Sequence, residues 1–157
     1  MSENTFSIVI NTLIGNVELI EQNGFLTHCR PSTHPAKKQK TTILLQKAMD
    51  QLHDYFAGKR KKFDLPLTLT GTTFQKSVWD ALTKIPYGET WSYQQLATTI
   101  HHAGAYRAVG SANSKNPICI IIPCHRVIHA SGDLGGYTSG IDKKVQLLQL
   151  ENAWGDR

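Results

Sequence analysis

The sequence changes character at a basic connector that contains a proline and a glycine. The connector begins with KRKK at 59 to 62 and continues as FDLPLTLTG up to Gly71. Because proline and glycine interrupt regular backbone, neither a helix nor a central strand can run through this segment. We therefore predict an α+β fold in two parts, a small N-terminal lobe over residues 1–65 and a mostly helical domain over residues 66–157.

The N-terminal part has the pattern of a short sheet covered by one helix. FSIVI at 6 to 10 and GNVELIE at 15 to 21 are rich in strand-forming residues, with turn signals at 11 to 15 and at Asn23-Gly24. We expect a hairpin or a meander. Between Thr41 and Gly58 apolar residues recur at helical spacing, at Ile43, Leu44, Met49, Leu52, Tyr55 and Phe56.

The second part contains short helices with well-marked starts. Thr72 and Gln75, like Ser92 and Gln95, have the spacing of capping boxes. Helices over about 72 to 85, 93 to 100 and 105 to 114, with a break at HHAG, give the outline of a helix-turn-helix. The β-branched run ICIII at 118 to 122 predicts a buried strand or extended segment that ends at Pro123.

Composition and charge narrow the function classes. No apolar stretch approaches the roughly 20 residues that span a bilayer, and the N-terminus lacks a signal-peptide pattern, so we expect a cytoplasmic monomer with free thiols. The net charge of +5 favours a polyanionic partner. The basic residues Lys37, Lys38, Lys40 and 59 to 62 fit a solvated face better than specific phosphate contacts.

Cys124 is the most informative of the three cysteines. It lies behind Pro123 and next to His125 and Arg126. A thiol needs a base or a nearby positive charge to become a nucleophile, and this sequence supplies both. Cys119, inside an apolar run, favours inert packing. His28, Cys29 and His34 offer too few ligands at awkward spacing for a metal, so no metal or other cofactor is expected.

The segment from 105 to 114 combines small residues with one long cation. Ala105, Ala108 and Gly110 accompany Arg107. Small residues let a helix approach another surface closely, but they serve equally for tight packing in a core. From this segment alone both interpretations stay open.

Five motifs, in order, resemble the family of methylated-DNA–protein-cysteine methyltransferases, which repair guanine alkylated at O6. They are FQKSVWDALTKIPYGETWSYQQLA at 74 to 97, RAVGSANSKNP at 107 to 117, PCHRV at 123 to 127, GGY at 135 to 137 and KKVQLLQLE at 143 to 151. The N-terminal part is less similar, with TLIG where the family usually has proline second. His101 and Ala103 stand where the family usually has glycine and proline.

The resemblance implies a catalytic role for five residues. Cys124 would take the alkyl group irreversibly, once per molecule. His125, polarised by Glu151, would remove the thiol proton through a water, and Asn116 would orient the loop. Tyr93 would donate a hydrogen bond or proton to the departing guanine.

The resemblance also implies how double-stranded DNA is bound. A helix-turn-helix would place the helix 105–114 in the minor groove, where Ala105, Ala108 and Gly110 allow close approach. Arg107 would fill the stack after the base is flipped out, and Gln94 would contact the backbone. The pocket for the guanine would be lined by Val127, Tyr137 and Thr138.

Two other function classes compete with the alkyltransferase. A non-catalytic module of the same fold would recognise alkylated bases and recruit partners, but such relatives lack the cysteine. An unrelated thiol enzyme or a small metal-binding regulator is the third class. The sequence leaves open whether O4-alkylthymine is also a substrate and how large an alkyl group is accepted.

Overall fold

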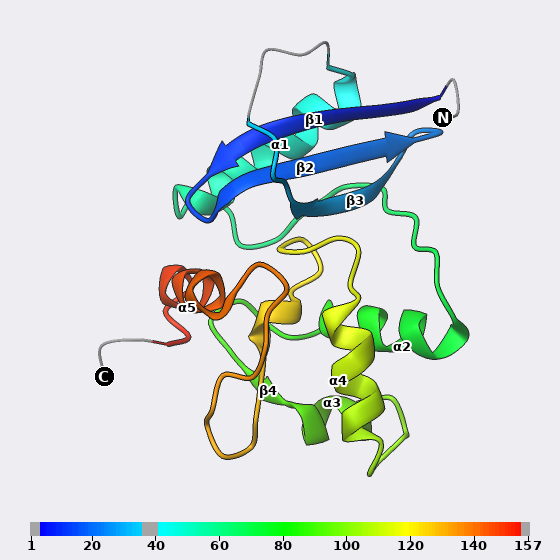
Figure 1. The fold of residues 1–157 in the computed structure, drawn as a ribbon, viewed down its shortest axis with the longest axis vertical. Coiled ribbons are helices and arrows are strands. Elements are labelled where there is room, and N and C mark those ends of the chain that lie inside the picture. The colour runs from blue at the N-terminus through cyan, green and yellow to red at the C-terminus, as the bar shows by residue number, and fades with distance from the viewer. Residues whose placement is uncertain (1–3, 36–40, 155–157) are drawn as a thin grey trace. The chain divides into compact units, whose positions relative to one another are not determined.

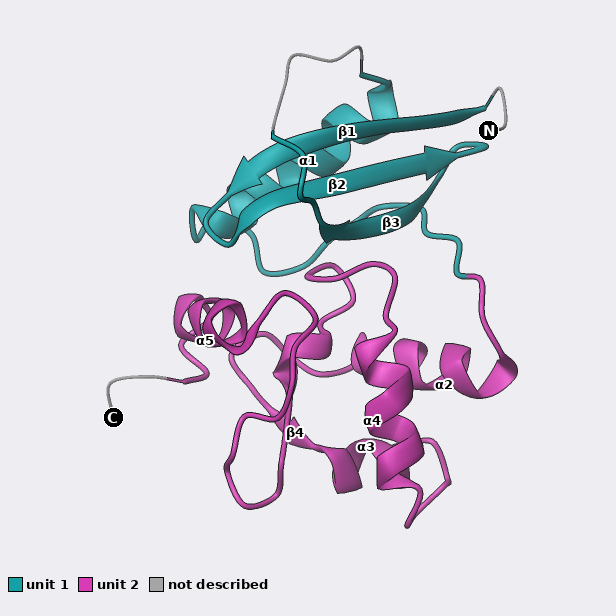
Figure 2. Cartoon of the chain, viewed as in Figure 1, with its two compact units in different colours: residues 1–69 teal, residues 70–157 magenta. Residues whose placement is uncertain are grey.

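The computed structural model describes residues 4–35 and 41–154, so Lys37, Lys38 and Lys40 lie outside the described residues. The chain forms two compact units, Met1–Leu69 and Thr70–Arg157, coloured separately in Figure 2. Each unit has its own set of packed elements, which we describe in turn.

Unit 1 is a three-stranded antiparallel meander covered by one helix (Figure 1). Strands β1 (Thr5–Thr12), β2 (Gly15–Gln22) and β3 (Phe25–Pro31) pair in sequence order, and α1 (Ile43–Phe56) packs against them. Asn23 and Gly24 join β2 to β3 with φ of 54° and 84°. Two successive residues with positive φ are what a tight hairpin turn requires. The Asn-Gly turn therefore adds β3 to the hairpin of β1 and β2, and the sheet is a meander.

The core of unit 1 forms where the apolar faces of sheet and helix meet. Leu19, Leu26, Leu45, Leu52 and Tyr55 are fully buried there. Burial of one such side chain contributes about 1.5–3 kcal/mol, and this packing stabilises a helix whose 14 residues would be only marginally helical in isolation.

A buried glutamine in α1 holds the connector that leaves unit 1. The Gln51 amide donates to the Asp64 carbonyl oxygen at 3.0 Å and accepts from the Asp64 N–H at 2.9 Å. Gln51 is 5% exposed, and its side chain pairs both backbone groups of Asp64, just before the segment bonds to Leu26 of β3 around Leu67.

Unit 2 is mostly helical and contains one small parallel strand pair. Its longer helices are α2 (Thr73–Leu82), α3 (Tyr93–Thr99), α4 (Tyr106–Ser114) and α5 (Ile141–Leu150). Strand β4 (Trp91–Ser92) directly precedes α3, and strand β5 (Val127–Ile128) directly follows the short helix η1 (Cys124–Arg126). Since Trp91 pairs with Val127, the start of α3 lies beside the segment that carries Cys124.

The predicted helix-turn-helix is formed by α3 and α4. Both capping boxes are present, Thr72 with Gln75 at α2 and Ser92 with Gln95 at α3. In the turn His101 has φ of 62° and Gly104 has φ of 90°. His101 thus adopts the left-handed backbone that glycine adopts at no steric cost. The Trp79 indole N–H donates to the Ala112 carbonyl at 2.9 Å and attaches α4 to α2.

The prediction of a strand or extended segment over 118 to 122 is wrong. The segment is a turn, in which the Ile122 N–H donates to the Ile118 carbonyl oxygen at 3.0 Å. The β-branched residues there reflect burial, because Ile118, Ile120 and Ile122 are at most 1% exposed. Side chains of this type are abundant in strands but serve any buried turn whose backbone groups find partners.

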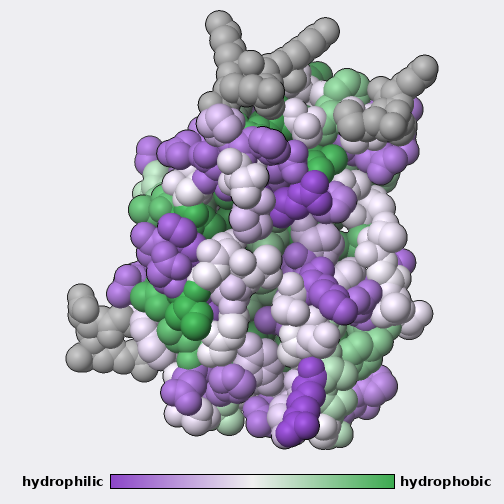
Figure 3. All heavy atoms as spheres, in the orientation of Figure 1, coloured by the Kyte–Doolittle hydropathy of each residue, from purple (hydrophilic) through white to green (hydrophobic). Residues whose placement is uncertain are grey.

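The surface carries scattered apolar side chains between polar ones. In the face drawn in Figure 3, apolar residues appear as separate patches with polar residues between them. No helix in the described part of the chain has the length and apolar character needed to cross a membrane.

We predict that Gln51→Leu removes both partners of the Asp64 backbone and lowers the free energy of unfolding by roughly 1–3 kcal/mol. Amide hydrogen exchange at Asp64 should accelerate, and urea denaturation should give the energy. The matched control is Gln46→Leu on the same helix, whose amide donates to exposed Asp50. Equal effects of the two substitutions would refute the role of Gln51.

Candidate active site around Cys124

Cys124 begins η1 and is 5% exposed. Asn116 holds the preceding turn, because its amide donates to the Ile122 carbonyl at 2.7 Å and its carbonyl oxygen accepts from the Ile118 N–H at 3.0 Å. The pKa of the Cys124 thiol is lowered by a hydrogen bond from Cys119, by one from Asn116 and by the charge of Lys144, which together outweigh burial. The site therefore favours the thiolate, the nucleophilic form.

The carboxylate of Glu151 joins both residues that follow Cys124. Its Oε2 lies 2.8 Å from His125 Nε2, and its Oε1 accepts from Arg126 Nε at 2.8 Å. Arg126 Nη2 donates to Oε2 at 3.0 Å, and Nη1 donates to the Ile85 carbonyl at 2.7 Å. Burial alone would raise the pKa of Glu151, but the bonds from His125 and Arg126 lower it to about 2. The carboxylate stays ionised.

His125 is a neutral imidazole with one nitrogen available. Burial lowers its pKa more than Glu151 raises it. Because Nε2 must carry the proton that it donates to Glu151, Nδ1 carries a lone pair. Nδ1 is buried and has no hydrogen-bond partner among the described residues. The ring is thus oriented as a base by a carboxylate on its far side.

Tyr93 is the first residue of α3 and is 8% exposed. Burial raises the pKa of its hydroxyl, and the nearby Cys124 raises it further, so the hydroxyl keeps its proton. Its ring lies 4.9 Å from the ring of His129. Gly135, with φ of 74°, approaches so closely that a Cβ there would lie 2.6 Å from the Tyr93 hydroxyl.

Lys144 is a site residue that we did not infer from the sequence. It is fully buried on α5, and its Nζ donates to the carbonyls of Val127 at 2.6 Å, Leu134 at 2.5 Å and Gly136 at 3.3 Å. Burial lowers its pKa to about 8, although Cys124 opposes this shift. The helical spacing could have indicated its burial, because Lys144 lies on the same face of α5 as Leu147, Leu148 and Glu151.

Asn113 on α4 is a second residue that we did not infer. It is 5% exposed and donates from Nδ2 to the Cys124 carbonyl at 3.4 Å. This bond connects the second helix of the helix-turn-helix directly to the segment that carries the thiol.

The residues expected to bind DNA lie on the outside of α3 and α4. Gln94, Arg107 and Ala108 are exposed, while Ala105 and Gly110 are half-buried. Gly110 also faces inward, since a Cβ there would lie 3.6 Å from the Tyr93 ring. The small residues of this segment therefore serve close packing against Tyr93 within unit 2, and they also leave an exposed outer face.

The three residues expected to line the base pocket differ in burial and contacts. Val127 is fully buried, and Tyr137 is half-buried with its ring 6.5 Å from that of His125. Thr138 is exposed, and its hydroxyl donates to the Ser114 carbonyl at 3.0 Å, which attaches this loop to the end of α4.

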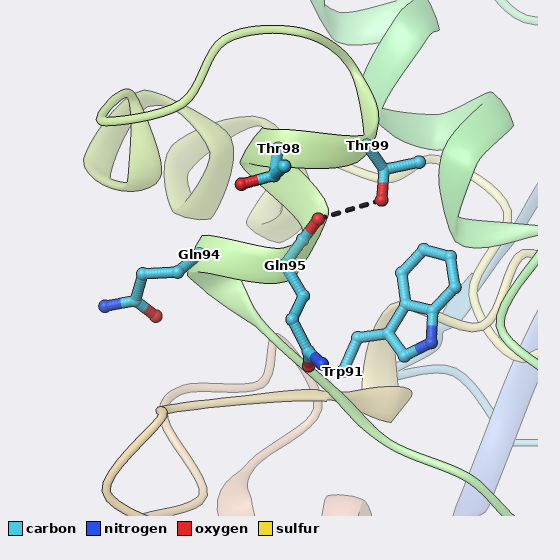
Figure 4. Close-up of a pocket in the computed structure, with 5 residues that line it drawn as sticks. All are labelled: Trp91, Gln94, Gln95, Thr98 and Thr99. Atoms are coloured by element: carbon cyan, nitrogen blue, oxygen red, sulfur yellow. Dashed lines mark hydrogen bonds between the residues drawn. The ribbon is translucent and has the colours of Figure 1, made fainter.

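A depression of about 520 Å³ lies along α3. It is lined by Trp91, Gln94, Gln95, Thr98 and Thr99. In Figure 4 the Thr99 hydroxyl donates to the Gln95 carbonyl oxygen, at 2.8 Å, and Gln94 points away from the Trp91 ring. Cys124 does not line this depression, so we assign the chemistry to Cys124 and not to this hollow.

The described residues contain no group of three or more His, Cys, Asp or Glu side chains that could hold a metal. His34 is exposed, whereas Cys29 is fully buried. His28 and Cys29 are neighbours on β3 and so point to opposite faces of the sheet.

We predict that Glu151→Gln lowers the free energy of unfolding by roughly 3–5 kcal/mol, because the buried Arg126 loses its counter-ion. Glu151→Gln combined with Arg126→Met should recover part of the loss. Glu18→Gln, which breaks the exposed pair with Arg30, should cost under about 1 kcal/mol. Urea denaturation followed by circular dichroism measures all three, and similar losses for the two single variants would contradict the prediction.

Comparison with known proteins gives one consistent family. A family model for the DNA-binding domain of 6-O-methylguanine DNA methyltransferase matches residues 73–153, and one for its ribonuclease-like domain matches residues 7–69. A methylated-DNA–protein-cysteine methyltransferase of Methanosarcina barkeri is 50% identical over 139 residues, which cover 88% of each chain. One of Mycobacterium tuberculosis is 58% identical over 106 residues, 68% of this chain and 64% of that protein.

A solved structure agrees with the sequence comparison. The crystal structure of Mycobacterium tuberculosis OGT in complex with DNA matches with a TM-score of 0.86 and 46% identity, over 94% of this chain and 92% of that one. The resemblance inferred from the five motifs is confirmed, and the chain belongs to the 6-O-methylguanine DNA methyltransferase family.

Proposed function

We propose that this protein repairs DNA by moving the alkyl group of O6-alkylguanine onto Cys124. The observation that carries the proposal is a buried thiol of lowered pKa, followed directly by a neutral histidine that a carboxylate orients. In the reaction the Cys124 sulfur attacks the alkyl carbon, a carbon–sulfur bond forms, and the bond from carbon to guanine O6 breaks with its electron pair.

His125 is proposed as the base for the thiol proton. Its Nδ1 accepts the proton through a bridging water, and Glu151 then stabilises the resulting imidazolium. Asn116 orients the turn, and its hydrogen bond further lowers the pKa of the thiol. These residues generate the thiolate and keep it aimed at the carbon.

The departing guanine needs a proton or a hydrogen bond, because a purine anion is a poor leaving group. Tyr93 is proposed for this role, since its raised pKa keeps the hydroxyl protonated and Cys124 is among the groups that perturb it. The same hydroxyl would compensate the charge that moves from the sulfur onto the base.

DNA binding is proposed for the outer face of α3 and α4. A base in a duplex is inaccessible to a buried thiol, so the nucleotide must be flipped out at a cost of a few kcal/mol. Arg107 is exposed on α4 and would occupy the vacated stack, while Ala105, Ala108 and Gly110 let the helix enter the minor groove. Gln94 would contact the backbone, and the net charge of +5 would attract the phosphates.

The flipped base is proposed to enter a pocket lined by Val127, Tyr137 and Thr138. Lys144 fixes three carbonyls of this loop and thereby its shape.

The remaining proposals follow from sequence and charge. We propose a cytoplasmic monomer that uses no cofactor, with residues 1–65 as a supporting lobe and 66–157 as the alkyltransferase domain. The non-catalytic recognition module is disfavoured because Cys124 is present with His125 and Glu151 around it. A metal-binding regulator is disfavoured because His28 and Cys29 point to opposite faces of β3, and His34 lies in the loop that follows this strand.

Methyl transfer should stop at one equivalent per protein molecule, because a thioether offers no bond that water or the named residues can cleave. Cys124→Ser should bind alkylated DNA and transfer nothing, since a serine hydroxyl is too weakly acidic for His125 to activate. A radiolabelled-methyl assay with excess DNA measures both, with Cys29→Ala as a control that keeps one equivalent. Repeated turnover, or transfer by the serine variant, would overturn the mechanism.

Arg107→Ala should slow repair of duplex DNA by roughly tenfold or more, because the flipped state loses the group that fills the stack. Transfer from the free modified base should change little. Lys115→Ala removes the same charge from the other end of α4 and should affect the duplex far less. Equal losses on duplex and free base would exclude this role for Arg107.

A further inference from the structure

The turn before Cys124 brings a second thiol to the active site. Cys119 and Cys124 are each 5% exposed. Cys119 Sγ lies 3.7 Å from the Asn116 carbonyl oxygen, and hydrogen bonding by the Cys119 side chain lowers the pKa of the Cys124 thiol. Cys119 is buried as expected, but it also has a polar contact that the apolar run did not indicate.

Two very tight turns explain how the thiols meet. Fully extended, five residues would span roughly 16–18 Å. Instead the Ile121 N–H donates to the Cys119 carbonyl at 2.8 Å, across Ile120, whose φ is 73°. The Cys124 N–H likewise donates to the Ile122 carbonyl at 2.8 Å, across Pro123, which has φ of −82° and ψ of 66°. These are successive γ-turns, the first of a rare and strained type.

The strain is concentrated at Ile120. A β-branched residue at positive φ costs of order 1–3 kcal/mol and persists only where its surroundings hold it. Here Asn116 bonds the backbone on both sides, at Ile118 and at Ile122. The backbone of the turn between the two cysteines is thus held in one conformation.

We propose that Cys119 is a resolving thiol, which forms a reversible disulfide with Cys124 when a peroxide oxidises the active-site sulfur. In the first step the Cys124 thiolate attacks a peroxide oxygen, giving a sulfenic acid and releasing hydroxide or alkoxide. In the second the Cys119 sulfur displaces the sulfenic hydroxyl, and with the thiol proton it leaves as water. Two thiols are oxidised to one disulfide, and one peroxide is reduced.

The site favours this chemistry over irreversible oxidation. Sulfenic acid forms fastest at a thiolate, and the surroundings of Cys124 stabilise its thiolate. A site that admits an alkylated base also admits a small peroxide. The thiol on the same turn is then the nearest nucleophile. For a protein that uses its cysteine once, a reversible oxidised state preserves the unreacted molecule.

Mass spectrometry of the oxidised full-length protein tests the proposal directly. Trypsin releases residues 116–126 as one peptide, NPICIIIPCHR, which contains both cysteines. After brief treatment with hydrogen peroxide and blocking of free thiols with maleimide, this peptide should lack two hydrogens and carry no maleimide. Dithiothreitol should restore both thiols. A peptide that only gains oxygen, or a disulfide to Cys29, would overturn the proposal.

Variants test the consequence for function. After prolonged peroxide, Cys119→Ser should accumulate sulfinic acid at Cys124, and dithiothreitol should recover several-fold less of its methyl transfer than in the wild type. Each variant is compared with its own untreated activity. Cys29→Ala should behave as the wild type, and Cys119→Ala provides a second variant should the serine fail to fold. Equal recovery with and without Cys119 would refute the role, while the peptide masses test it even if no methyl is transferred.

Discussion

The buried carboxylate of Glu151 is the interaction on which the rest of unit 2 depends. It lies at the end of α5, bonds His125 and Arg126 of η1, and through Arg126 reaches the Ile85 carbonyl after α2. Three separate segments are thereby fixed around one charge. Burying that charge is costly, and the hydrogen bonds on both oxygens offset the cost. The same bonds that hold the fold also orient the histidine, so stability and the proposed proton transfer share one group.

The turn over 118 to 124 positions the Cys124 thiol. Asn116 fixes the turn from one side, and Asn113 on α4 bonds the Cys124 carbonyl from the other. The helix proposed to enter DNA and the sulfur proposed to take the alkyl group are therefore connected by a single buried amide. A displacement of α4 would move the nucleophile, which is a physical reason to expect that binding and reaction are coupled. The double γ-turn that aims Cys124 also places Cys119 beside it.

Short sequence patterns correctly predicted the helix starts and the turn that are stabilised by residues close together in the chain. The capping boxes at Thr72 and Ser92 started their helices as expected, because a hydroxyl and an amide three residues apart satisfy backbone donors in any surroundings. Asn23-Gly24 gave its turn for the same reason. The run ICIII was misjudged, since β-branched density indicates burial and the partner of the backbone decides between strand and turn. That partner is the Asn116 side chain, and nothing in the run itself identifies it.

The sequence by itself determined the family and the nucleophile, because PCHRV and four further motifs are specific, and it determined the division into a sheet with one helix and a helical remainder. Only the tertiary structure decided which groups tune that nucleophile. Lys144, Asn113 and Cys119 each looked like an ordinary helix or core residue. In the folded chain the charge of Lys144 and the side chain of Cys119 lower the pKa of Cys124, and the Asn113 amide bonds the Cys124 carbonyl. The reason is physical: desolvation and hydrogen-bond partners set the pKa of a thiol, and both exist only once distant segments enclose it.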